Sequence, residues 1–168
     1  MFTSGDYVVC GNNGVCVVQD ITTLNITGVD KHREYYLLKP VYLTGSTVYI
    51  PVDTADKAMR KAFSRQEALS FIDSIPDIPL IPVTDEKTLE KTYKEYMHLN
   101  SPEGWLRLIK TIYLRKEKRI MKGNKVTAVD SKYFKQAEDF LYGELSVALD
   151  MSKEEIRDYI VRTMDERK

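Results

Sequence analysis

The chain has 168 residues, of which 43 % are apolar and 30 % charged, and its 25 basic residues are balanced by 25 acidic ones. This composition indicates a globular protein of one or two domains and excludes a chain that is basic throughout. No apolar run reaches the roughly 20 residues of a membrane helix, and the N-terminus lacks the basic start and apolar core of a secretory signal. We therefore expect a cytoplasmic protein without a membrane partner.

A β-hairpin is the first predicted element, because the runs YVVC and VCVV flank a Gly-Asn-Asn-Gly turn within residues 7–18. A three-residue loop centred on Asn13 would put Cys10 opposite Cys16 and allow a disulfide, whereas a two- or four-residue loop would put the thiols on opposite faces. Packing as small apolar side chains is the favoured interpretation, and a redox pair is the alternative. No metal site is expected, because the two histidines stand at no ligand spacing.

Further strands are predicted from runs rich in Val, Ile, Thr and Tyr that are separated by turn signals. These runs occupy residues 15–27, 33–41, 46–52 and, as a fifth candidate, 59–63. Strands at this spacing without an intervening helix predict a small antiparallel β-barrel. We place this barrel domain at residues 1–63.

The run STVYIPV suggests a binding edge. Its alternation predicts that one set of side chains faces the core (Val48, Ile50, Val52) and the other faces outward (Thr47, Tyr49, Pro51). Proline cannot donate to a β-ladder, so Pro51 indicates an edge strand. Such an edge can accept a strand from another protein. The alternative is a protected edge that binds nothing.

The remainder of the chain is predicted to be helical. A capping box at Ser64 and Glu67 opens a short helix, and the stretch PDIPLIP that follows it is interpreted as a linker, so that residues 64–83 connect two domains. Helices are then predicted at residues 84–99, 101–122, 127–149 and 152–164. Together they indicate a compact helical bundle at residues 84–168 and an α+β protein in two domains.

Basic residues are concentrated in the bundle. Residues 107–135 hold ten of them against two acidic residues, a net charge of +8, which can bind phosphates independently of sequence. The alternative is a solvated helix end, where cations favour the helix dipole. Trp105, the only tryptophan, shares a helical stripe with Leu108, Ile109 and Ile112, which indicates a core position.

No catalytic motif is present: the sequence lacks a nucleophile elbow, a nucleotide-binding glycine loop and a zinc-protease motif. We therefore expect no enzyme, no cofactor and no small-molecule substrate.

The ordered set of motifs resembles the CarD/CdnL-like family of bacterial RNA-polymerase-binding transcription regulators. The matching stretches are GDYVVCGNNGVCVVQDI, EYYLLKPVYLTGSTVYIPV, GWLRLIK and AEDFLYGELSVAL, and they span nearly the whole chain. The resemblance implies a Tudor-like barrel that binds the RNA polymerase β subunit and a helical domain that contacts promoter DNA largely without regard to sequence. It also implies stabilisation of the open promoter complex during initiation.

The resemblance also assigns residues. Polymerase contact is carried over to Thr47, Val48, Tyr49 and Pro51, a minor-groove wedge to Trp105, and phosphate contacts to Arg107, Lys110 and Lys132. Two positions depart from the family pattern: Tyr49 stands where some members have arginine, and Leu108 where some have a basic residue. These departures keep a second hypothesis open, an adaptor that binds polymerase or another protein without touching DNA. In either case we expect a monomer.

Overall fold

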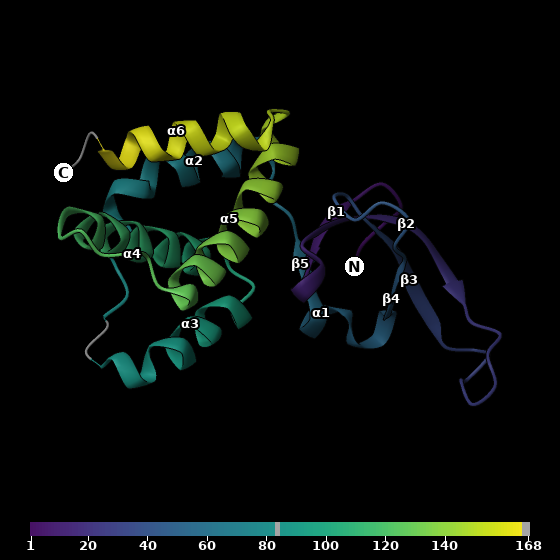
Figure 1. Ribbon diagram of the computed structural model, residues 1–168. Coiled ribbons are helices and arrows are strands. Elements are labelled where there is room, and N and C mark those ends of the chain that lie inside the picture. The colour runs from purple at the N-terminus through teal and green to yellow at the C-terminus, as the bar shows by residue number, and fades with distance from the viewer. Residues whose placement is uncertain (83–84, 166–168) are drawn as a thin grey trace. The chain divides into compact units, whose positions relative to one another are not determined.

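The computed structural model describes residues 1–82 and 85–165 and divides into two compact units, Met1–Ala62 and Phe63–Lys168 (Figure 1). The first unit is built of strands and the second of helices, so the predicted α+β class is confirmed. The division falls within one residue of the predicted end of the strand domain.

The strand unit is one antiparallel sheet with the order β4-β3-β2-β1-β5. Its strands are β1 (Tyr7–Cys10), β2 (Val15–Thr23), β3 (Glu34–Pro40), β4 (Val48–Pro51) and β5 (Met59–Lys61). Two short helical segments, η2 (Val52–Thr54) and α1 (Ala55–Ala58), connect β4 to β5. Since no pairing joins β4 to β5 among the described residues, the sheet is open and the expected closed barrel is not confirmed.

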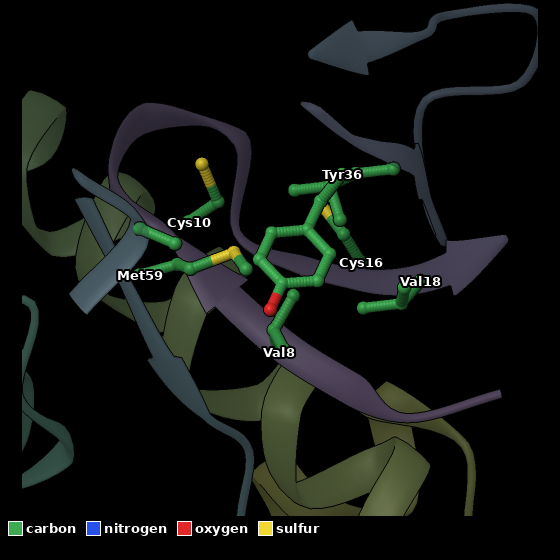
Figure 2. Close-up of a cluster of buried hydrophobic side chains, with 8 residues drawn as sticks. Val8, Cys10, Cys16, Val18, Tyr36 and Met59 are labelled. Carbon is green, nitrogen blue, oxygen red and sulfur yellow. The ribbon is translucent and has the colours of Figure 1, made fainter. Parts of the chain in front are cut away.

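One face of the sheet carries the core of this unit. Figure 2 shows side chains from β1, β2, β3 and β5 gathered there. The buried members are Val8, Cys10, Cys16, Val18, Tyr36, Leu38, Ala55 and Met59. Val48, Ile50 and Val52 pack against this core, as the alternation in STVYIPV predicts.

The hairpin register differs from both alternatives considered for the cysteines. The turn η1 (Gly11–Asn13) is centred one residue before the three-residue loop that would allow a disulfide, and the register pairs Val8 with Cys16. Moving the centre of the turn by one residue shifts the pairing partner of each strand residue by two positions. Because side chains alternate with a period of two, each side chain stays on the same face of the sheet. Cys10 and Cys16 are therefore diagonal neighbours on the core face, both are buried, and neither forms a disulfide.

The helical unit contains a helix in each predicted range, and the helix predicted from residue 84 begins at Leu89, after a single turn of 3₁₀ helix. The helices are α2 (Arg65–Ser74), α3 (Leu89–His98), α4 (Pro102–Met121), α5 (Ala128–Leu149) and α6 (Lys153–Asp165), with single turns η3 (Ile75–Asp77) and η4 (Glu86–Thr88). The capping box of α2 is formed, because the N–H of Glu67 donates to Ser64 Oγ (3.1 Å) and the N–H of Ser64 donates to the Glu67 carboxylate (3.0 Å).

The proline-rich stretch belongs to the helical unit and is not a free linker up to Pro82; residues 83–84 lie outside the described residues. Ile75, Ile78 and Ile81 are buried, and the N–H of Ile81 donates to Thr111 Oγ1 on α4 at 2.9 Å. Single-turn 3₁₀ and polyproline conformations both repeat every three residues. Isoleucines spaced by three therefore share one face, which packs inward.

Candidate interaction surfaces

The β4 strand forms an edge of the sheet, as predicted. It pairs antiparallel with β3 through Leu38–Val48, Leu37–Tyr49, Tyr36–Ile50 and Tyr35–Pro51. Its other side pairs with no strand among the described residues. Its row of backbone donors and acceptors on that side is available to a further strand.

The four residues predicted to contact polymerase lie in β4 or directly before it. Tyr49 is 44 % exposed and points away from the core, whereas Val48 packs against the core. Thr47 is exposed, and its hydroxyl accepts a hydrogen bond from the ammonium of Lys39. Pro51 is half-buried at the end of the strand. Tyr49 and Thr47 therefore supply outward side chains, and Val48 supplies an inward anchor.

An exposed apolar segment lies in the connection between β3 and β4 and was not identified from the sequence. Val41, Tyr42 and Leu43 follow β3 and are 38 %, 43 % and 50 % exposed. Sequence reasoning assigned Val41 to the end of a strand and made nothing of the two residues after it. Consecutive exposed apolar side chains are typical of interaction surfaces.

Trp105 lies in the core of the helical unit, where its periodicity places it. Its side chain is 0 % exposed, and its ring centroid lies 5.5 Å from that of Phe140 on α5. A wedge must present its ring to the base steps. In this structure the ring is not presented to a ligand, and the wedge assignment stays a prediction. Leu108 is likewise 0 % exposed, so a basic residue at this position would be buried.

Arg107 and Lys110 are directed at the proline-rich stretch. The Arg107 guanidinium donates to the carbonyl oxygens of Pro79 (3.2 Å) and Leu80 (3.1 Å) and lies 5.0 Å from the ring centroid of Tyr96. These contacts fasten the stretch to α4.

The Lys110 ammonium donates to the carbonyl oxygens of Ile75 (2.8 Å) and Ile78 (2.6 Å). Partial burial lowers the pKa of Lys110, which the charge of Asp77 partly offsets. In this structure Arg107 and Lys110 thus bind backbone carbonyls.

Lys132 is the predicted phosphate contact that remains on the surface. Its side chain is 56 % exposed, and its ammonium lies 3.9 Å from the Glu90 carboxylate and 5.3 Å from the ring centroid of Tyr133. Of the four residues carried over to DNA contact, one is core, two hold a neighbouring segment and one is exposed. They do not form a single surface.

A polar pocket of about 260 Å³ lies at the C-terminal end of α4. It is lined by Glu86, Arg115, Lys118, Arg119, Lys122 and Asn124. The basic segment was found in the sequence, but its gathering around one pocket depends on the turn after α4 and on η4.

A hydrogen-bond network that reaches from the buried Asp130 to the exposed Glu86 holds Arg115 in this pocket. Arg115 Nε donates to Asp130 (3.0 Å) and its Nη1 to Glu86 (3.1 Å). Asp130 is 0 % exposed and also accepts the hydroxyl proton of Tyr93 at 2.8 Å. Burial, together with this hydrogen bond, raises the pKa of Tyr93. Arg115 is therefore held rigidly between two carboxylates.

Neither a metal cluster nor a membrane span is found in the part of the chain that the structure describes. No three His, Cys, Asp or Glu side chains gather there in a way that could hold a metal ion. None of its helices is at once long and apolar enough to cross a bilayer.

The strand unit is thus a small open sheet with an accessible edge, the architecture of a protein-interaction module. Residues 2–62, which cover this unit, match the CarD-like/TRCF RID domain family. For the strand unit, the match supports the resemblance to the CarD-like family that the sequence motifs indicate. Comparison with curated proteins gives no match.

A CarD-like RID domain indicates a role in transcription regulation through an interaction with the RNA polymerase β subunit. Such domains belong to polymerase-interacting regulators that are not enzymes. The helical unit lies outside the matched residues.

Proposed function

We propose that this protein binds the RNA polymerase β subunit through the β4 edge, contacts promoter DNA through the helical unit, and thereby stabilises the open promoter complex. The observation that carries this proposal is the edge strand β4 with its exposed Tyr49, inside the unit that matches the CarD-like/TRCF RID domain. One copy suffices to bridge polymerase and DNA, so we propose a cytoplasmic monomer.

Docking proceeds by strand addition. A strand of the β subunit pairs with the outer side of β4, which contributes main-chain hydrogen bonds without demanding a particular sequence. Specificity then comes from side chains on either side of the new ladder. Tyr49 and Thr47 supply these contacts, because they point outward, while Val48 keeps the strand seated on the core.

DNA contact is supported by the charge of one segment of the helical unit. Residues 107–135 carry a net charge of +8, and cations held near phosphates bind DNA largely independently of sequence. Lys132 contributes to this contact from the surface of α5. Arg107 and Lys110 contribute only through their charge, as long as they stay on their carbonyl partners.

Stabilisation of the open complex follows from bridging. A protein held on polymerase that binds DNA at the melted region better than at the closed duplex shifts the equilibrium toward the open state by that difference in affinity.

A polymerase-binding adaptor without direct DNA contact is the second candidate. The observation that favours it is the placement of Trp105 in the core together with the engagement of Arg107 and Lys110 by backbone carbonyls. This adaptor would bind polymerase in the same way, so the two candidate functions differ only in whether the protein contacts DNA.

The docking step is tested by binding of the full chain to the purified β lobe. Tyr49→Glu introduces a charge at the edge strand, and Tyr7→Glu is a matched control, because Tyr7 is 45 % exposed on β1 inside the sheet. We expect wild type and Tyr7→Glu to bind alike and Tyr49→Glu to lose binding. Equal binding by both variants would contradict the proposal. DNA affinity of the wild type then separates the two candidates.

A further inference from the structure

The end of α4 carries more positive charge than a helix terminus needs. Residues 115–125, here called the α4 tip, contain six basic residues and one acidic residue, Glu117. Two like-charged pairs, Arg115–Arg119 and Lys118–Lys122, stand four residues apart on the helix. Such spacing makes neighbours repel and destabilises the helix. The charge is therefore retained at a cost to stability.

Capping of the helix does not explain this charge. The N–H of Asn124 donates to the carbonyl of Arg119 (2.8 Å), and the N–H of Gly123 donates to that of Ile120 (3.0 Å). Gly123 has φ +77°, the left-handed conformation that this closing motif requires. Backbone donors thus satisfy these terminal carbonyls, and the lysine side chains are not required for it.

The cations of the tip are arranged around the polar pocket. Arg115 is fixed at the back by Asp130 and Glu86, and Arg119 donates to the carbonyl of Lys125 at 3.5 Å. Lys118 and Lys122 are exposed and line the same pocket of about 260 Å³. The pocket is thus large enough for an anionic group and is bordered by two lysines that can turn toward it.

Two apolar side chains protrude at the same place. Met121 is 86 % exposed and Ile120 is 65 % exposed. Lys118, Met121 and Lys122 share one face of α4, because their spacing is three and four residues. Minor-groove-binding proteins use apolar side chains to contact base steps and neighbouring cations to contact phosphates.

We propose that the α4 tip is a nucleic-acid-binding site in which Lys118 and Lys122 contact backbone phosphates while Met121 lies in the groove between them. The proposal rests on the proposed function and assigns its DNA contact to residues that sequence motifs did not indicate. Nucleic acid is favoured over a membrane surface, because an interfacial helix presents a broad apolar face, whereas the tip presents two apolar residues among cations.

The phosphate contacts are tested by the salt dependence of DNA affinity. The full chain binds a fluorescent duplex with a short melted bubble in a series of KCl concentrations, as wild type, as K118A/K122A and as K91A/K94A. The last variant removes the same charge from exposed positions of α3. We expect K118A/K122A to flatten the slope of log affinity against log salt by about 2, since each phosphate contact contributes about 0.9. K91A/K94A should match wild type, and equal slopes for both double variants would overturn the site.

The apolar contact is tested by Met121→Ala, with Leu69→Ala as a control at an exposed apolar position of α2. We expect Met121→Ala to weaken binding to the bubble DNA several-fold without changing the salt slope, and Leu69→Ala to bind as wild type. No effect of Met121→Ala would overturn the groove contact.

Two outcomes separate this inference from the proposed function. If wild type binds DNA but both double variants bind equally, the site fails and the proposed function stands. If wild type binds the β lobe but no DNA, the adaptor is the correct function and the site fails with the DNA contact. Binding to anionic phosphatidylglycerol vesicles without binding to DNA would overturn the proposal in favour of a membrane surface.

Discussion

The ammonium of Lys110 lies 2.6 Å from the carbonyl oxygen of Ile78, so a residue whose motif suggested a phosphate contact instead fastens a proline-rich stretch to α4. The same ammonium also serves the carbonyl of Ile75. A charged donor on two carbonyls makes Lys110 a structural residue of the helical unit.

This relationship predicts a stability effect. Lys110→Met keeps most of the aliphatic stem but removes the charged donor from both carbonyls, of which that of Ile75 keeps the N–H of Ile78. A hydrogen bond from a charged group is worth about 1.5–3 kcal/mol. We expect the free energy of unfolding to fall by about 2 kcal/mol in urea denaturation. Lys132→Met, at a side chain 56 % exposed, should change it by less than about 0.5 kcal/mol. Equal effects of the two substitutions would contradict a structural role for Lys110.

The burial of Trp105 predicts a spectroscopic signature. As the only tryptophan and 0 % exposed, it should emit at the short wavelengths of an apolar environment and resist quenching by acrylamide, both in the free protein and after addition of DNA. Trp105→Ala should cost about 3–5 kcal/mol of stability, because it leaves a large cavity in the core. Red-shifted emission with ready quenching would show an exposed ring and restore the wedge.

The buried thiols predict low reactivity. Burial, and then the proximity of Cys10, raises the pKa of Cys16 to about 12, and burial raises the pKa of Cys10. At neutral pH the native protein should react with a thiol reagent far more slowly than the unfolded chain, in which both thiols react. Rapid formation of a disulfide under mild oxidant would instead support the redox-pair alternative.

The same thiols predict a loss of stability in alkali. A pKa of about 12 in the folded state lies above the ordinary value of 9.0, so the folded state holds the Cys16 proton more tightly. This contribution is fully present below about pH 9 and is lost as the pH rises toward 12. Cys16→Ala should therefore unfold with a weaker pH dependence between pH 9 and 11. An unchanged dependence would contradict a buried, neutral thiol.

Local signals in the sequence predicted much of the fold. Alternation in STVYIPV correctly assigned the core face of β4, and Ser64 and Glu67 correctly marked the start of α2. These predictions succeeded because period-two alternation and capping depend on neighbours in the chain.

The features that the sequence did not predict depend on tertiary contacts. The prolines at 76, 79 and 82 indicated a linker, whereas Ile75, Ile78 and Ile81 are buried within the helical unit. The hairpin register was left open in the sequence analysis, because the Gly-Asn-Asn-Gly stretch fits several loop lengths and centres. The candidate DNA residues were carried over from a motif, and what Arg107 contacts is decided by a segment far from it in sequence.

The central claim, docking on RNA polymerase through the β4 edge, is tested most directly by amide hydrogen exchange of the full chain with and without the purified β lobe. Strand addition predicts slower exchange in peptides covering Val48–Pro51 on binding, with little change in peptides of β1, which is already paired on both sides. Binding that leaves exchange in β4 unchanged while protecting another segment would contradict the account.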